Sequence, residues 1–345
     1  MISRKRAPTM QDVARAAEVS QATVSLVLNG VAGIRVSEQT RQRVIRAAEE
    51  LGYRRSPRLR ADDREGAVIG LIIDDLNASP FASPLFEGAR EAAWEHHCVV
   101  NIVTTRNLVA IEGAAIEAML RQPVIGIIYA TLITREVEPP SLGAAVPMAL
   151  LNCYDRSGEY ASVIPDDVAG ARALTNALLA AGHQRVGHIA GEAWLDAGRD
   201  RLLGYREAIE ARGLAFDPAL VQSLGSALQA GYNGTHALLD MADPPTAIFC
   251  FNDRMALGAL DAIRERGLRV PDDISIVGFD NDPFVTSLFP GGLTSAVLPH
   301  EEMARWAVEH ILAVRRRARD EQLKRRMDCS IIRRKSIGRP SRKSP

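Results

Sequence analysis

Residues 9–29 read TMQDVARAAEVSQATVSLVLN, and this stretch decides the fold of the N-terminal part of the chain. It holds two short segments whose apolar residues recur at helical spacing. The first contains Val13, Ala14 and Ala17, and the second contains Val24, Val27 and Leu28. Thr9 and Ser20 precede the two segments, where a hydroxyl can accept a backbone N–H of the first helical turn. Two short helices joined by a tight turn predict a helix-turn-helix.

The exposed face of the second helix begins with polar residues, namely Ser20, Gln21, Thr23 and Ser25. Short hydroxyl side chains at a helix N-terminus suit phosphate, because the unpaired N–H groups and the helix dipole both favour an anion. Gln21 has the amide best able to bond a base edge in the major groove. This face therefore predicts contact with DNA.

A third helix is expected from Ser37, a capping residue, to Leu51, with Gly52 after it. Residues 1–60 hold 12 Lys and Arg against five Asp and Glu. The whole chain holds 42 of each sign, so residues 61–345 hold 30 basic and 37 acidic residues. A basic head on an acidic body is typical of a nucleic-acid-binding domain joined to another module. The alternative is a solvated three-helix lobe with no ligand.

Length and composition limit the remaining classes. A chain of 345 residues with 47% hydrophobic residues predicts two or three domains with large cores. No long apolar run follows the charged N-terminus, so we expect a cytoplasmic protein with no membrane partner. The four cysteines, Cys98, Cys153, Cys250 and Cys329, are scattered and are expected to be reduced thiols. No metal site, cofactor or catalytic motif is expected.

From Ala67 onward, short apolar runs alternate with amphipathic helical segments. The expected strands are Ala67–Ile73, Cys98–Thr104, Val124–Tyr129 and Pro147–Leu151 in a first group, and Arg185–Ala190, Ala247–Phe251 and Ile274–Phe279 in a second. This alternation predicts parallel sheets with helices on both faces. The expected fold is an all-α helix-turn-helix head, residues 1–60 including a hinge, and an α/β core, residues 66–345. The core would have two doubly wound lobes that meet near 152–165 and 281–300.

Polar residues follow the ends of several expected strands. They are Asp74, Asp75, Asn77, Asn152, Asn252, Asp253, Asp280 and Asn281. In open α/β sheets, ligands bind outside the carboxyl ends of the strands. Any one of these residues could be a simple turn residue, but their recurrence at successive strand ends favours a cleft for a small molecule between the lobes.

The chain resembles the LacI/GalR family of transcriptional regulators over essentially its whole length. The head matches through Asp12-Val13-Ala14, Val19-Ser20, Thr23-Val24-Ser25 and Val27-Leu28-Asn29. The core matches through residues 181–186 (AGHQRV), 201–205 (RLLGY), 245–249 (PTAIF), 252–259 (NDRMALGA) and 267–280 (GLRVPDDISIVGFD).

The resemblance implies a homodimer that binds a pseudo-palindromic operator, with a periplasmic-binding-protein-like core that senses a small molecule. Its DNA-binding positions fall on Thr9, Ser20, Gln21, Ala22, Thr23, Ser25, Leu26, Asn29, Arg35, Ser37, Thr40 and Leu59. Its effector-binding positions fall on Phe81, Asn152, Arg201, Tyr232, Asn252, Asp280 and His300, and the residues after strand ends add Asp74 to the predicted effector contacts. A sugar-like effector is expected first, although a nucleoside fits the same chemistry. Induction and corepression both remain open.

Three departures from the family pattern concern the head and the hinge. Glu18 stands where the family usually has Gly, so either the turn avoids positive φ or it costs about 1 kcal/mol. Leu26 stands where some members have a base-reading Arg. Residues 52–63 read GYRRSPRLRADD, which leaves Leu59 as the apolar wedge for the minor groove and places two acids near phosphate. We expect a weak or differently built hinge.

Two other classes of function compete with a ligand-responsive repressor. A binding protein for transport would not need the basic head, and it would need a signal peptide. An enzyme on a doubly wound fold would need a nucleophile with its base, a metal cluster or a phosphate loop, and none of these motifs is present in the sequence. The sequence therefore favours a regulator that is not an enzyme.

Overall fold

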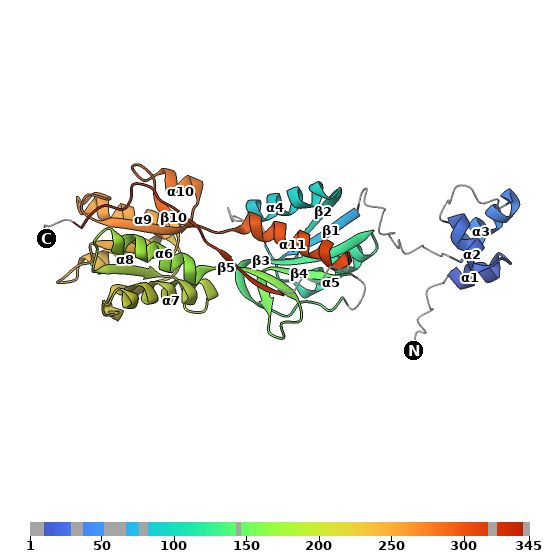
Figure 1. Ribbon diagram of the computed structural model, residues 1–345, viewed down its shortest axis with the longest axis horizontal. Coiled ribbons are helices and arrows are strands. Elements are labelled where there is room, and N and C mark those ends of the chain that lie inside the picture. The colour runs from blue at the N-terminus through green and yellow to red at the C-terminus, as the bar shows by residue number, and fades with distance from the viewer. Residues whose placement is uncertain are drawn as a thin grey trace. The chain divides into compact units, whose positions relative to one another are not determined.

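The structure is a computed structural model that describes residues 10–28, 37–51, 67–75, 82–142, 146–316 and 323–340. The chain separates into two compact units, residues 1–59 and 60–345. Figure 1 gives the labels of the helices and strands in both units. None of the helices in the described ranges is long and apolar enough to cross a membrane.

The first unit contains three helices, α1 (Met10–Ala16), α2 (Gln21–Leu28) and α3 (Glu38–Glu50). Their apolar stripes meet in one small core, in which Val13, Val24 and Val44 have no solvent-exposed surface. The two predicted serine caps are confirmed. Ser20 Oγ accepts the Thr23 N–H at 3.1 Å, and Ser37 Oγ accepts the Thr40 N–H at 3.2 Å.

The second unit begins with a six-stranded parallel sheet in the order β11-β5-β4-β3-β1-β2. This first lobe contains β1 (Ala67–Ile73), α4 (Ala82–Glu95), β2 (Cys98–Thr104), α5 (Val109–Leu120), β3 (Val124–Val137), β4 (Met148–Asp155), β5 (Ala161–Asp166), α11 (His300–Arg315) and β11 (Lys324–Asp328). Helix α11 comes from the far end of the sequence and packs beside α4 (Figure 1).

The second lobe is built on a six-stranded sheet in the order β12-β10-β9-β8-β6-β7, parallel except for the antiparallel pairing of β12 with β10. It contains α6 (Asp167–Ala180), β6 (Val186–Ala190), α7 (Asp196–Ala211), a 3-10 turn (Pro218–Leu220), β7 (Val221–Ser223), α8 (Leu228–Leu239), β8 (Ala247–Cys250), α9 (Asp253–Glu265), β9 (Ser275–Asp280), α10 (Pro283–Ser287), β10 (Thr294–Val297) and β12 (Ile331–Ile332).

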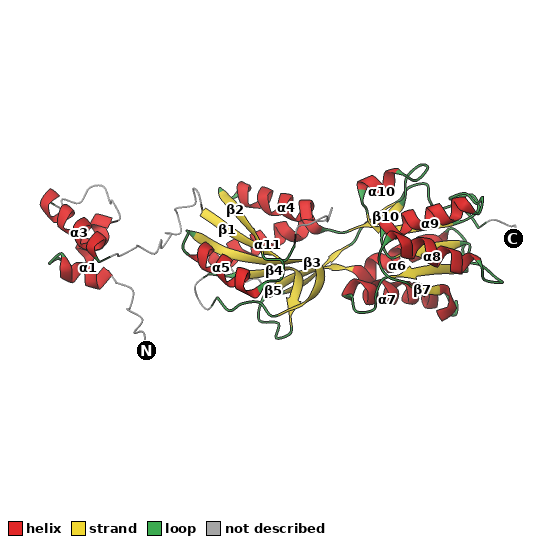
Figure 2. Ribbon diagram, turned by 180° about the vertical axis from the view of Figure 1, so that it is seen from behind, coloured by secondary structure: helices red, strands yellow, loops and turns green. Residues whose placement is uncertain are grey.

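Helices cover both faces of the second sheet (Figure 2). Successive residues of a strand point to opposite faces, and β8 illustrates this. Ile248 packs into the cluster that includes Met255 of α9, whereas Phe249 packs into the cluster that includes Leu174 of α6. All four side chains are buried. The predicted doubly wound fold class is confirmed.

The chain passes between the lobes three times, after β5, between β10 and α11, and between β11 and β12. The first two passages coincide with or adjoin the segments predicted at 152–165 and 281–300. The third passage and the return of α11 and β11 to the first lobe were not predicted. Strand β11 begins Lys324-Arg325-Arg326, and an exposed edge strand of charged residues shows no apolar alternation in the sequence.

The basic C-terminal segment continues along the second lobe after β12. Residues 333–340 are ordered against the second lobe, where Ser336 is 1% exposed and donates to the Ile276 carbonyl at 2.6 Å. The Gly338 N–H donates to Ser275 Oγ at 2.9 Å. The last five residues lie outside the described part of the chain.

Candidate functional site

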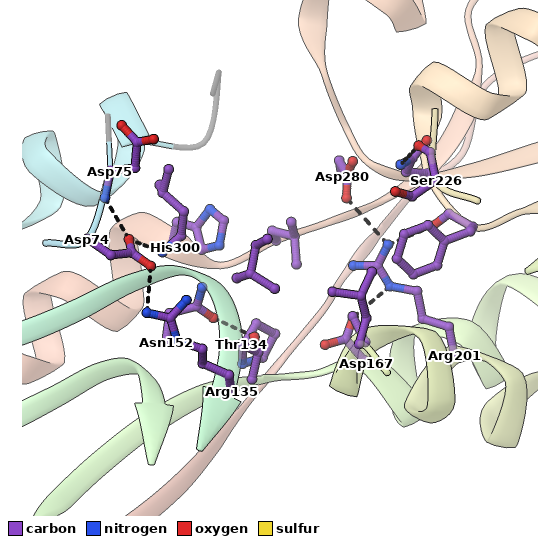
Figure 3. A pocket seen from close by; sticks show the side chains of 18 of the residues that line it. Asp74, Asp75, Thr134, Arg135, Asn152, Asp167, Arg201, Ser226, Asp280 and His300 are labelled. Carbon is purple, nitrogen blue, oxygen red and sulfur yellow. Dashed lines mark hydrogen bonds and ion pairs between the residues drawn. The ribbon is translucent and has the colours of Figure 1, made fainter. Parts of the chain in front are cut away.

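A cavity of about 490 Å³ lies between the two lobes, at the facing carboxyl ends of their strands (Figure 3). Both lobes contribute polar side chains to its wall. Six predicted effector residues line it, namely Asp74, Asn152, Arg201, Asn252, Asp280 and His300. The ends of parallel strands meet at one edge of each sheet, which is why residues so far apart in sequence converge there.

The first-lobe wall is organised around Asp74, which follows β1. Its Oδ1 accepts the backbone N–H groups of Asp75 at 2.8 Å and Leu132 at 3.0 Å. Its Oδ2 lies 3.0 Å from Arg135 Nη2, and the same nitrogen donates to Asn107 Oδ1 at 2.7 Å. The Arg135 side chain is 38% exposed, so it is held by Asp74 and Asn107 and still reaches solvent.

Asn152 lines the cavity at a kink in β4, with a φ of 59°. Its Nδ2 donates to the Thr131 carbonyl at 2.9 Å, and its Oδ1 accepts from Thr134 Oγ1 at 2.6 Å. The pairing of β3 with β4 shifts register between Ala130 and Arg135. The amide of Asn152 thus fixes the bend of the wall, and it keeps one N–H for a ligand.

Arg201 of α7 is the centre of the second-lobe wall. Its Nε donates to Asp167 Oδ1 at 2.7 Å, and its Nη1 donates to the Phe251 carbonyl at 2.6 Å. Its Nη1 also lies 3.5 Å from Asp280 Oδ1 (Figure 3). The guanidinium carbon lies 3.7 Å from the ring centre of Phe279, a stacking distance for a cation on an aromatic face.

Burial controls the charges around Arg201. Burial raises the pKa of Asp280 well above its usual range, and Arg201 opposes this shift. Burial raises the pKa of Asp167 as well, again against Arg201. Burial and the nearby Arg201 lower the pKa of His300 to about 4, so this imidazole is neutral at pH 7. The groups around Arg201 are therefore paired or neutral, and such groups suit hydroxyls better than a charged ligand.

Asn252 caps α9 and faces the cavity at the same time. Its Oδ1 accepts the Met255 N–H at 2.8 Å, and its Nδ2 donates to the Ser226 carbonyl at 3.0 Å. One amide N–H is left for a ligand. The cap explains why an Asn stands directly before this helix.

The two remaining predicted effector residues are Tyr232 and Phe81. Tyr232 does not line the cavity, because its hydroxyl donates to Glu265 of α9 and its ring lies edge-on to His236 at 4.6 Å. Phe81 lies outside the described residues. Conversely, Asn107, Arg135 and Ser226 line the cavity and were not predicted. The strand expected to end at Tyr129 continues to Val137, and Arg135 lies on this extension.

The described part of the head presents a short hydroxyl cluster. Ser20 Oγ lies 2.9 Å from Thr23 Oγ1 at the N-terminus of α2, and Ser37 Oγ lies 2.7 Å from Thr40 Oγ1 at the N-terminus of α3. Gln21 is exposed beside the first pair. Thr9, Asn29, Arg35 and Leu59 lie outside the described residues, as do the side chains of Ala22, Ser25 and Leu26.

The φ of Glu18 decides between a turn of the head that avoids positive φ and a turn that is strained. This φ is 52°, so the turn between α1 and α2 uses the left-handed region with a residue that disfavours it. The turn therefore carries the strain that the absence of Gly implied.

A helix-turn-helix head and a two-lobed core with a cavity between the lobes define a ligand-responsive transcriptional regulator. Two family models match the chain. One is described as bacterial regulatory proteins, lacI family, and matches residues 9–56, and the other is described as a periplasmic binding protein-like domain and matches residues 175–337.

Known proteins extend this match over almost the whole chain. The chain is 33% identical over 328 residues to the HTH-type transcriptional repressor CytR of Escherichia coli strain K12, which covers 94% of this chain and 95% of that protein. The complex of the transcriptional regulator CelR with cellobiose matches with a TM-score of 0.65 and 29% identity, over 95% of this chain and 99% of that one. The lac repressor dimer bound to operator and the anti-inducer ONPF matches with a TM-score of 0.65 and 28% identity, over 96% of this chain and 100% of that one.

The chain belongs to the LacI family of bacterial regulatory proteins. It is a DNA-binding transcriptional regulator with a ligand-sensing core, and it is not an enzyme. The resemblance inferred from the sequence motifs is confirmed.

Proposed function

We propose that the cavity between the lobes binds a neutral, polyhydroxylated effector, a sugar in the first place and a nucleoside as the alternative. The observation that carries this proposal is the set of paired polar groups around Arg201, where Asp167 and Asp280 hold a buried guanidinium against the cavity. Such groups can exchange hydrogen bonds with hydroxyls without receiving a net charge. CelR, which binds cellobiose, supports the sugar class.

The proposed effector contacts are Asp74, Asn152, Arg201, Asn252, Asp280 and His300, with Arg135 added from the first lobe. Phe81 stays a proposal from the sequence alone, and Tyr232 is left out. The aromatic ring of Phe251 lines the cavity beside Arg201 and offers an apolar face for a sugar ring or a base.

In the proposed activity, a cytoplasmic homodimer represses transcription from a pseudo-palindromic operator. Residues 1–60 form the DNA-binding domain with its hinge, and residues 66–345 form the sensing and dimerisation core. The DNA contacts are those proposed from the sequence, with Gln21 as the base reader and the hydroxyls of Ser20, Thr23, Ser37 and Thr40 near phosphates. The lac repressor dimer bound to operator supports the dimeric arrangement.

The effector acts by shifting a population. A ligand that contacts both lobes favours one spacing of the lobes over another, and in a dimer this changes the spacing of the two heads. Operator half-sites lie about 34–36 Å apart, so a displacement of a few ångströms weakens or strengthens DNA binding. Both induction and corepression follow from this scheme.

The test begins with a thermal-shift screen of D-ribose, cellobiose and the four ribonucleosides against the full-length protein. An operator duplex is obtained in parallel by in vitro selection, and its binding is followed by fluorescence anisotropy. We expect one class of compound to raise the melting temperature and to change operator affinity at least fivefold. A protein that binds the selected operator but responds to no sugar or nucleoside would overturn the proposed effector class.

A further inference from the structure

The corner at the end of β9, residues 280–282, is strained where it faces the cavity. Asp280 has a φ of 109° and Asn281 a φ of 56°, both in the region that L side chains rarely adopt. Such a backbone conformation is strained and persists only when its surroundings hold it in place. Because Asp280 lines the cavity and contacts Arg201, whatever holds this corner also orients that wall.

Two buried side chains, Asp253 and Ser295, hold the corner through hydrogen bonds. The Asn281 N–H donates to Ser295 Oγ at 3.0 Å, and the hydroxyl of Ser295 donates to Asp253 Oδ1 at 2.7 Å. The Asp282 N–H donates to Asp253 Oδ2 at 2.7 Å. Asp253 and Ser295 are fully buried, so these bonds are shielded from water.

A third support comes from the C-terminal segment, 53 residues further along the chain. Arg334 Nη2 donates to Asn281 Oδ1 at 2.7 Å, and its Nη1 donates to the Leu293 carbonyl at 2.6 Å. One guanidinium thus ties the corner to the start of β10. Arg334 itself is not among the residues that line the cavity.

Two hydrogen bonds with Thr294 fix the backbone around Arg334. Its N–H donates to Thr294 Oγ1 at 2.9 Å. Two residues on, Ser336 Oγ accepts the Thr294 N–H at 2.9 Å. A planar fork on a fixed backbone can hold two acceptors at once, which the single ammonium of a lysine cannot reproduce.

We propose that Arg334 is a positioning residue of the effector cavity, which acts through Asn281 to hold the strained corner that presents Asp280. The C-terminal segment, which is rich in Arg and Lys, is then part of the effector-binding machinery. This inference rests on the proposed effector cavity.

The test compares full-length Arg334→Lys with wild type and with Arg333→Lys as the matched control, because Arg333 is an exposed arginine one position away. Hydrogen exchange is measured at the Asn281 and Asp282 amides and at the amides of β8. We expect Arg334→Lys to accelerate exchange at the corner at least tenfold and to leave β8 unchanged, while Arg333→Lys leaves both unchanged. Unchanged exchange at the corner, or equal acceleration in β8, would overturn the proposal.

A second variant separates positioning from general stability. Asn281→Gly removes the acceptor of Arg334 while tolerating the positive φ. If Arg334 acts through Asn281, adding Arg334→Lys to Asn281→Gly does not accelerate exchange of the Asp282 amide further. An additive effect would mean that Arg334 acts by another route.

The ligand arm uses cellobiose in calorimetry on the same variants. We expect Arg334→Lys to weaken cellobiose binding at least tenfold relative to Arg333→Lys, with the melting temperature lowered by no more than a few degrees. If wild type does not bind cellobiose, this result counts against a disaccharide effector, while the exchange measurements decide the role of Arg334 on their own.

Discussion

Arg201 Nε donates to Asp167 Oδ1 at 2.7 Å, and the two side chains are only 5% and 3% exposed. The pair links α7 to the start of α6 and faces the cavity. A buried ion pair costs desolvation energy that is offset only when its geometry is good and its remaining groups are bonded. Here the Phe251 carbonyl and Asp280 complete the environment of the guanidinium, so the pair serves both the fold and the site.

Arg201→Lys is the first test of this arrangement. A lysine keeps the charge but loses the fork that contacts Asp167 and the Phe251 carbonyl together. We expect effector affinity to fall at least tenfold, about 1.4 kcal/mol, with operator affinity in the absence of effector within twofold of wild type. Calorimetry with the ligand from the screen and anisotropy with operator measure the two quantities. A simultaneous loss of operator binding would make Arg201 purely structural.

Arg201→Ala is expected to behave differently. It leaves Asp167 and Asp280 buried without their cation, and breaking a buried pair in this way costs about 3–5 kcal/mol. We therefore expect a clear drop in the denaturation midpoint of the core in urea, larger than that of Arg201→Lys. Equal midpoints for the two variants would contradict the account of the charge network.

Glu18→Gly tests the strain in the turn of the head. Glycine adopts the observed φ of 52° without penalty, so relief of about 1 kcal/mol is expected. The Val19 N–H donates to the Ala14 carbonyl at 3.0 Å across this turn. Its hydrogen exchange should slow roughly fivefold in Glu18→Gly and should not slow in Glu18→Ala. Slowing by both variants would point to the glutamate charge instead of the backbone.

Burial of His188 is expected to cause part of the loss of stability of the second lobe at acidic pH. Burial lowers its pKa from 6.5 to about 4, and its ring stacks on Phe249 at 4.6 Å. Between pH 6.5 and about 4 the unfolded chain therefore binds a proton that the folded chain does not. The free energy of unfolding falls as the pH decreases through this window, by up to about 1.4 kcal/mol per unit.

The matched variant is His188→Phe, which keeps an aromatic ring in the stack and removes the titrating group. We expect a shallower dependence of urea stability on pH between 6.5 and 4 than in wild type. Identical slopes for the two proteins would show that His188 takes up its proton as readily in the folded chain as in the unfolded one.

The altered hinge gives a prediction outside the described residues. Leu59 is the apolar side chain available as a minor-groove wedge in residues 52–63. If this hinge is weak or differently built, Leu59→Ala changes operator affinity by less than tenfold. A larger loss in the anisotropy assay would show that Leu59 acts as a minor-groove wedge and would contradict the weak or altered hinge.

The sequence was most informative where periodicity and capping act locally. Ser20 and Ser37 cap their helices as expected, and the strands from Ala67 and Cys98 have the predicted bounds. It was least informative where tertiary contacts override local pattern. The extension of β3 beyond Tyr129 pairs with β4 only after a register shift that lies beside Asn152, and β11 is an exposed strand of mostly charged residues that carries no apolar signal.

The residues of the candidate site were likewise predicted where local pattern decides their position and missed where tertiary contacts decide it. Residues at the ends of strands, such as Asp74 and Asp280, reach the cavity because strand ends converge. Tyr232 does not line the cavity, because position on a helix alone does not give the direction of a side chain, and its hydroxyl donates to Glu265. Arg334 lies in a basic segment near the C-terminus whose sequence shows no sign of a role in the site. Its proposed role rests on the hydrogen bonds that it donates to Asn281 and Leu293.

The most direct test of the central claim is the operator-binding isotherm of the full-length protein, with and without the ligand found in the thermal-shift screen, for wild type and Arg201→Lys. We expect the ligand to change the operator Kd of wild type at least fivefold in one direction. For Arg201→Lys we expect a change of less than twofold at the same ligand concentration. A ligand that raises the melting temperature of wild type but leaves its operator Kd unchanged would contradict the claim that the cavity controls DNA binding.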